Sequence, residues 1–220
     1  GLVHALPLLE VTINGRTGRF VLDTGTGDCL LDTRFARRAE VELGHFDQAG
    51  FAGGRVGRWQ LGRIESLSIG GSRFAQLPAM VASLDDAFHH GYDRSVDGIV
   101  GAGLLRASGG IDIEYQRACF RLGSPGLRDS AELWIAGPHY PLTSCRVNGG
   151  PASSWFIDSG MSGMDLACSE SAARRHGAQL LHGDLEAHGG GGTLGARAVR
   201  IRRFRHADLE YDTLSAAVIP

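Results

Sequence analysis

Lysine is absent from the 220 residues, and all 22 basic residues are Arg. This absence excludes a Walker-type phosphate loop and a Schiff-base mechanism, because both need a Lys side chain. No apolar run approaches the roughly 20 residues of a membrane-spanning helix, so we expect no integral membrane segment. The formal net charge is −2, and a chain without a basic surplus is not expected to bind nucleic acid.

Paired cysteines are also lacking. The four cysteines stand at positions 29, 119, 145 and 168, and none forms a C-x-x-C pair, which argues against a zinc ribbon or a thioredoxin-type site. No His-Glu-x-x-His occurs either, and we expect neither a metal nor a cofactor. Buried free thiols and one or two disulfides are both open, with free thiols favoured because Cys119 and Cys145 lie in strand-like alternation.

Glycine is plentiful by contrast, with 33 residues, whereas aromatic residues make up only 7%. The glycines follow no collagen-like period. Glycine at this density is typical of tight turns and close backbone contacts. The composition therefore favours an all-β protein.

The chain contains an internal repeat. "PLLEVTINGRTGRFVLDTG" (7–25) is matched by "PLTSCRVNGGPASSWFIDSG" (141–160), and each copy has an Asn-Gly turn, which predicts a hairpin. The match continues through "ARR" (36–38 and 173–175) and through "FAQLPAMV" (74–81) and "YDTLSAAV" (211–218), while the offset grows from 134 to 137. We interpret residues 1–125 and 141–220 as two homologous lobes joined by a linker at 126–140.

The first lobe has an ending that the second does not match. "DGIVGAGLL" (97–105) and "IDIEYQRACFRL" (111–122) follow the repeated part, and at the offset of 137 a second "DGIVG" would begin at about residue 234. We expect the second lobe to lack its last strands or to receive its closing strand from elsewhere. A second lobe that is simply shorter is the alternative.

The repeat places an acid at the same point of each lobe, Asp23 and Asp158. Two carboxyls a few ångströms apart do not both ionise readily, so such a pair shares one proton. The ionised member can activate a water while the protonated member polarises a carbonyl. A paired acid is therefore suited to amide hydrolysis without a metal.

The segments "VLDTGTG", "FIDSGMSG" and "DGIVGAGLL" resemble the pepsin and retropepsin superfamily of aspartic proteases, over all of the first lobe and most of the second. The resemblance implies two pseudo-twofold-related β-barrel lobes of the acid protease fold with a cleft between them. It assigns Asp23 and Asp158 as the catalytic dyad and Thr24 and Ser159 as the residues that interlock the two loops. The resemblance also implies that the two catalytic loops are supported by Gly25, Thr26 and Gly160. It implies a Gly-rich flap in each lobe, at "AGFAGGRVGRW" (49–59) with Gly53 and Gly54, and at "HGGGGTLGARA" (188–198) with Gly190 and Gly191. Met161 departs from the family, which usually has a small residue there.

The function implied by this resemblance is an aspartic endopeptidase that acts on extended peptide or protein substrates as a two-lobed monomer or a dimer. By analogy with the family, we expect a bacterial, periplasmic or secreted protein. One alternative is a catalytically inactive retropepsin-like module that binds peptides or regulates a partner. Another is a zymogen or fragment that needs a second chain.

Two other motifs are open to a functional interpretation. "GGGTLG" (190–195) fits G-x-G-x-x-G, but the alternating "ARAVRIRRF" that follows indicates a strand, whereas nucleotide binding needs a helix there. "RIRRFRH" (200–206) is interpreted as a half-exposed strand with Arg on its outer face. Binding of an acidic partner by this Arg face is the alternative.

Overall fold

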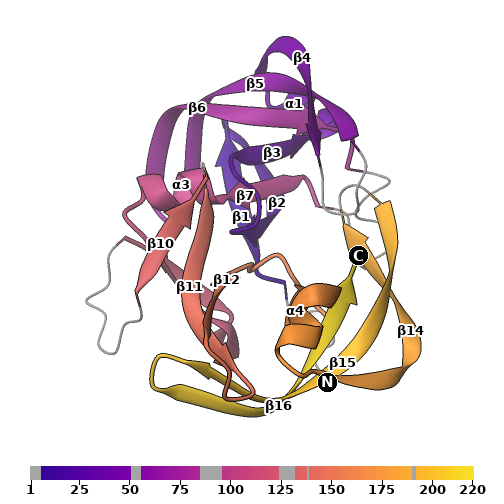
Figure 1. Ribbon diagram of the computed structural model, residues 1–220. Coiled ribbons are helices and arrows are strands. Elements are labelled where there is room, and N and C mark those ends of the chain that lie inside the picture. The colour runs from indigo at the N-terminus through magenta and orange to yellow at the C-terminus, as the bar shows by residue number, and fades with distance from the viewer. Residues whose placement is uncertain (1–5, 51–55, 85–95, 124–131, 138, 190–191) are drawn as a thin grey trace.

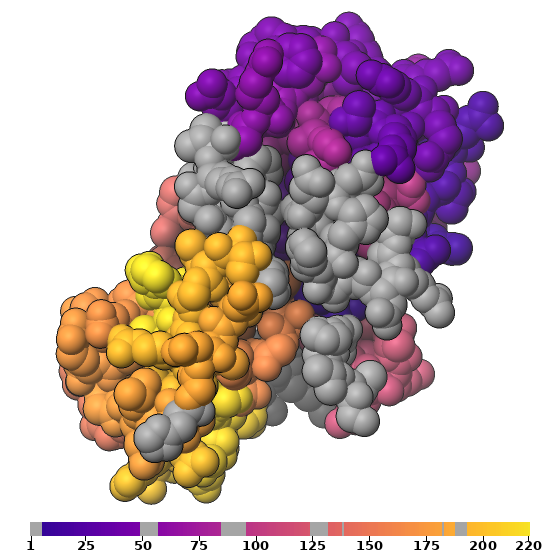
Figure 2. All heavy atoms as spheres, turned by 90° about the vertical axis from the view of Figure 1, so that its right-hand side faces the viewer, coloured from indigo at the N-terminus to yellow at the C-terminus, as the bar shows by residue number. Residues whose placement is uncertain are grey.

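The computed structural model describes residues 6–50, 56–84, 96–123, 132–137, 139–189 and 192–220. Strands dominate these residues and form two lobes, one above the other in Figure 1, which confirms the all-β prediction. Figure 2 shows the same division from the side, with the early residues at the top and the orange and yellow C-terminal residues at the bottom. No helix within the described ranges is long and apolar enough to cross a bilayer.

The first lobe is a closed barrel of six strands. The strands pair in the order β1-β2-β7-β3-β6-β5, and β5 returns to β1. The barrel strands are β1 (Leu8–Ile13), β2 (Arg16–Asp23), β3 (Cys29–Asp32), β5 (Val56–Ile69), β6 (Ser72–Ala82) and β7 (Gly98–Gly101). Around them lie β4 (Glu42–Gly50), the helices α1 (Thr33–Arg38) and α3 (Ala102–Ala107), and the hairpin of β8 (Ile111–Glu114) and β9 (Cys119–Leu122), which the 3-10 turn η1 (Tyr115–Arg117) connects.

The second lobe is an open sheet. Its strands pair in the order β10-β11-β15-β16-β13, with β12 on β11 and β14 on β15. The elements are β10 (Leu133–Ala136), β11 (Tyr140–Val147), β12 (Ala152–Phe156), β13 (Leu166–Ser169), α4 (Glu170–Arg175), β14 (Gln179–Gly189), β15 (Gly192–His206) and β16 (Leu209–Ile219). Part of the segment predicted as a linker is thus the strand β10.

The two lobes pair their strands at corresponding positions. In the first lobe Thr12 of β1 lies opposite Ser68 of β5, and in the second Arg146 of β11 lies opposite Arg205 of β15. Arg146 follows Thr12 by 134 residues, and Arg205 follows Ser68 by 137. Both Asn-Gly turns have the positive φ angles that the sequence predicts, with Asn14 at 48° and Asn148 at 50°. The same offset relates the parallel pairs Cys29–Ala79 and Leu166–Ala216 and the helices α1 and α4.

Each lobe has its own hydrophobic core. In the first, Phe20 and Phe35 meet edge to face with ring centroids 5.3 Å apart among fully buried aliphatic side chains. The core of the second is smaller and is built around Phe204 and Trp155, whose centroids lie 5.6 Å apart. All four cysteines are free, and those at positions 29 and 145 are buried within these two cores.

The strand β7 explains why "DGIVG" contains two glycines. β7 is inserted between β2 and β3, parallel to the first and antiparallel to the second. A Cβ atom on Gly98 would lie 2.4 Å from the carbonyl oxygen of Leu30, and one on Gly101 would lie 2.3 Å from that of Asp28. Only a residue without a side chain allows the backbones to approach this closely.

No strand takes the place of β7 in the described part of the second lobe. There β12 pairs only with β11, and β13 pairs only with β16. The consequence is visible in the exposed fractions: Val21 and Leu22 of β2 are 1% and 0% exposed, whereas their counterparts Phe156 and Ile157 are 37% and 40% exposed. Two strand edges and two large apolar side chains are therefore left uncovered beside Asp158.

We expect the backbone amides of β12 that point away from β11 to exchange with solvent at least about tenfold faster than the corresponding amides of β2, which β7 covers. Hydrogen exchange followed by NMR would measure both strands in one sample. The amides of β12 that bond to β11 are the internal control. Equal protection of the two edges would contradict this prediction and would mean that another strand covers β12.

Candidate active site

The two acids that the repeat places at equivalent points, Asp23 and Asp158, lie at the ends of corresponding strands at the lobe interface. Asp23 ends β2, and Asp158 follows β12 by two residues. The strands are held alike, because Leu22 N–H donates to the carbonyl of Pro7 and Ile157 N–H donates to that of Pro141, both at 2.9 Å. The Pro-Leu pairs that open both copies of the repeat therefore anchor the chain directly before each acid.

Four hydrogen bonds connect the two loops across the interface. The hydroxyl of Thr24 donates to the carbonyl of Ile157 (2.6 Å) and accepts from Ser159 N–H (3.0 Å). The hydroxyl of Ser159 donates to the carbonyl of Leu22 (3.0 Å) and accepts from Thr24 N–H (3.1 Å). Each hydroxyl is thus both donor and acceptor, which gives the arrangement the interlock that the resemblance implied for this pair.

Gly25 and Gly160 allow the carboxyls to approach one another. The position of a Cβ atom on Gly25 is 2.9 Å from Oδ1 of Asp23 and 3.0 Å from both carboxyl oxygens of Asp158. A Cβ atom on Gly160 would lie 2.4 Å from Cγ of Asp23. Any side chain at either position would occupy the space of the two acids, so the structure brings together the pair that the repeat predicted.

The two acids have different surroundings. Asp23 accepts hydrogen bonds from Gly25 N–H (2.6 Å) and from the hydroxyl of Thr26 (2.8 Å). Asp158 accepts from Gly160 N–H at 2.8 Å, but Met161 stands where the other loop has Thr26 and offers no hydroxyl. The symmetry of the backbone is therefore broken by one side chain.

Burial raises the pKa of the Asp158 carboxyl from its ordinary value of 3.8 to about 6, and the negative charge of Asp23 and a hydrogen bond to that residue add to the shift. Backbone N–H groups of Gly160 and Met161 act in the opposite direction. A carboxyl that is desolvated beside a like charge retains its proton to higher pH. Of the two acids, Asp158 is therefore the one whose surroundings favour the protonated form.

Helix α3 supports only the first loop. Ala102 N–H donates to the carbonyl of Thr26 (2.8 Å), and Gly103 N–H donates to that of Gly27 (2.6 Å). A Cβ atom on Gly103 would lie 3.1 Å from this same carbonyl oxygen. The family resemblance of "IVG" (99–101) and the segment after it implies packing under the catalytic loop, but it did not single out Ala102 and Gly103 as the donors.

Two aromatic residues near the site were also missed. Burial and then the negative charge of Asp158 raise the pKa of the Tyr115 hydroxyl, so this side chain, at the tip of the β8–β9 hairpin, lies near the dyad. The ring of His139 covers Gly27, where a Cβ atom would lie 2.8 Å from Nδ1. Tyr115 lies in "IDIEYQRACFRL" (111–122) and His139 in no motif, and nothing in the sequence singled out either side chain.

The predicted flap glycines, Gly53, Gly54, Gly190 and Gly191, lie outside the described residues, so the flaps and the cleft between the lobes stay predictions. The predicted residues Thr24, Gly25, Thr26, Ser159 and Gly160 all surround the two acids. Within the described ranges, no group of three or more His, Cys, Asp or Glu side chains is placed to hold a metal ion.

Comparison with known proteins agrees with this geometry. Residues 9–105, which include Asp23 and β7, match the family described as aspartyl protease. Among solved structures, a retropepsin-like aspartic protease from Rickettsia conorii resembles the chain with a TM-score of 0.37 and 18% identity, over 49% of this chain and 75% of that chain. No curated protein gives a significant match. The family match agrees with the resemblance indicated by the motifs over residues 9–105.

Proposed function

We propose that this chain, whose residues 9–105 match the aspartyl protease family, is an endopeptidase that cleaves peptide bonds with a water molecule activated between Asp23 and Asp158. The observation that carries the proposal is the meeting of two carboxyls from two lobes at one point, beside Gly25. The four hydrogen bonds between Thr24, Ser159 and the neighbouring carbonyls support it, because they fix the two loops relative to one another.

The different surroundings of the two acids assign their roles. Asp158, with its raised pKa, enters the reaction protonated and donates a hydrogen bond to the carbonyl oxygen of the substrate. Asp23, which accepts hydrogen bonds from Gly25 and Thr26, is the carboxylate that takes a proton from the water. The water then attacks the carbonyl carbon, and the proton on Asp23 passes to the leaving amine as the C–N bond breaks.

An extended peptide is the substrate that suits this arrangement, since the acids lie at strand ends between two sheets and main-chain groups can bind main chain. The runner-up is a module that binds such peptides without cleaving them. The uncovered edge of β12 next to Asp158 favours that alternative, because a loosely held carboxyl is a poor catalyst. Turnover of a denatured protein substrate by the purified chain distinguishes the two.

We expect kcat/KM to be highest at mildly acidic pH. It should fall as the pH rises through about 6, since Asp158 then loses the proton that it must donate. It should also fall at low pH, when the remaining carboxylate becomes protonated and no base is left. A pH–rate profile on a fluorogenic peptide measures both limbs.

Met161→Thr provides a matched test of the assignment. The new hydroxyl would face Asp158 as that of Thr26 faces Asp23 and would stabilise the ionised carboxylate, so the upper limb of the profile should move to lower pH. Leu180→Thr, at an exposed position of β14, is the control and should leave the profile in place. An upper limb that does not move in Met161→Thr would contradict the role of Asp158 as the acid.

A further inference from the structure

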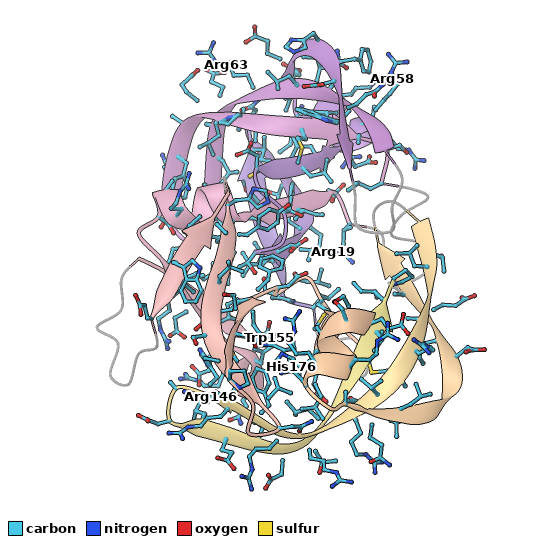
Figure 3. All side chains as sticks on the ribbon, viewed as in Figure 1. Arg19, Arg58, Arg63, Arg146, Trp155 and His176 are labelled. Atoms are coloured by element: carbon cyan, nitrogen blue, oxygen red, sulfur yellow. The ribbon has the colours of Figure 1, made fainter. Side chains whose placement is uncertain are left out.

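A hollow lies in the C-terminal lobe, at the end of β12 away from Asp158. It has a volume of about 760 Å³ and is formed by the turn between β11 and β12, the end of α4, and the paired strands β15 and β16. Figure 3 shows Trp155 and His176 close together beside this end of α4. The residues that line the hollow include Asn148, Gly150, Arg175, His176, Arg202 and Arg203.

His176 is the unusual member of this set. It is 8% exposed, and its Nδ1 atom has no hydrogen-bond partner among the described residues. The other ring nitrogen, Nε2, lies 3.4 Å from the hydroxyl of Ser153, which accepts a hydrogen bond from Trp155 Nε1–H at 2.9 Å. The indole can only donate, so the hydroxyl hydrogen of Ser153 is free to donate to Nε2. Nε2 accepts this hydrogen bond in the tautomer whose ring hydrogen is on Nδ1.

The free nitrogen faces the hollow. A Cβ atom on Gly150 would lie 3.7 Å from Nδ1 of His176, and Gly150 lines the same hollow. A buried N–H group without an acceptor destabilises the folded state by about 1–3 kcal/mol. A ligand that accepts a hydrogen bond from Nδ1–H would remove this cost. Nδ1 is itself shielded from solvent, and Gly150 adds no side chain to that cover.

Positive charge surrounds this donor. Arg175 and Arg202 line the hollow, and neither forms an ion pair or a side-chain hydrogen bond within the part of the chain that the structure describes. Arg203 also lines it and pairs with Glu210 at 2.9 Å. Asp212 is the single acid in the lining. The surroundings therefore suit an anion that can accept hydrogen bonds from both guanidinium and imidazole groups.

The first lobe shows that the scaffold does not impose these side chains. There Asn14 donates to the carbonyl of Ala39, as Asn148 donates to that of His176, so the backbone clamp is repeated. At the offset of 137, however, Ala39 stands in place of His176, and Glu65 stands in place of Arg202. His176 and Arg202 are therefore found in the second lobe alone, whereas Arg175 is matched by Arg38 of the first lobe.

We propose that this hollow is a binding site for a phosphate group, held by Nδ1–H of His176 and by the guanidinium of Arg202, with Arg175 nearby. A phosphate is favoured over a carboxylate because it presents more acceptor oxygens and more negative charge to several cationic donors at once. The ligand would connect the end of α4, which carries Arg175 and His176, to the strand β15, which carries Arg202. The inference is independent of the proposed proteolysis.

Titration of the purified chain with inorganic phosphate tests the site. We expect a rise in Tm that equal ionic strength of chloride does not produce, and a change in the side-chain ¹⁵N shift of His176. Arg202→Glu, which copies the first lobe, should weaken binding at least about tenfold. Arg73→Gln removes an exposed charge from the first lobe and is the control for a general charge effect.

His176→Phe keeps the ring beside Trp155 but removes Nδ1, and it should also lose the response to phosphate. Because Arg202 is exposed, its variant keeps the test valid even where His176→Phe does not fold. Parallel titrations with glycerol phosphate and with phosphatidic acid vesicles distinguish a free phosphomonoester from a lipid headgroup as the source. No response of the wild type to inorganic phosphate, a response only to vesicles, or equal binding by Arg202→Glu would overturn the proposal.

Discussion

Asp23→Asn and Asp158→Asn are each expected to lower kcat/KM for a peptide substrate by about a thousandfold or more. Asn is close in shape to Asp, so the loops should stay interlocked through Thr24 and Ser159. The first variant removes the base that takes a proton from water, and the second removes the acid that polarises the carbonyl. Since the two groups act on one step, the double variant should be little worse than either single one.

The measurement is the initial rate of cleavage of a fluorogenic peptide at mildly acidic pH, with Tm recorded for each variant. Asp112→Asn is the control, because Asp112 is also an aspartate but its carboxylate pairs with Arg121 at 2.8 Å instead of facing a second acid. It should keep the wild-type rate. Wild-type cleavage by either dyad variant would refute the proposed function, whereas the phosphate site in the second lobe would be unaffected.

The meeting of the two acids could be predicted because the information for it is local and occurs twice. Each copy of the repeat specifies a hairpin through Asn-Gly and then a strand that ends in Asp-Thr-Gly or Asp-Ser-Gly. Thr24 and Ser159 then reach across the interface by the same geometry in opposite directions. The similarity of the two segments thus supplied the long-range information that a single copy would have lacked.

The asymmetry of the site could not be predicted in the same way. The substitution of Met161 for the hydroxyl-bearing Thr26 was visible, but its effect depends on how deeply Asp158 is buried, which is a tertiary property. The support that Ala102 and Gly103 give to the first loop depends on α3 packing beneath it. The charge of Asp158 acts on Tyr115 because the β8–β9 hairpin packs its apolar face on the first core.

The open sheet of the second lobe was expected from the repeat, but its physical consequence was not. Phe156 and Ile157 lose the cover that β7 gives to Val21 and Leu22, so the strand that carries Asp158 is the less protected of the two. The position of Asp158 therefore depends more on contacts from the other lobe, namely the interlock and the close approach of Gly160 to Asp23. A change at this point of contact should have a large effect.

Gly160→Ala is accordingly expected to lower kcat/KM by about a hundredfold or more, because a Cβ atom there would lie 2.4 Å from Cγ of Asp23 and must displace the carboxyl. Overpacking of this kind should also lower the free energy of unfolding by about 1–3 kcal/mol, measured by denaturant unfolding. Gly44→Ala, where a Cβ atom would make ordinary contact with Leu61 at 3.6 Å, is the control and should change neither quantity. If Gly160→Ala instead kept the wild-type rate, the close approach of Asp23 and Asp158 would not be needed for catalysis. The proposed mechanism, in which the two acids share a proton, would then be wrong.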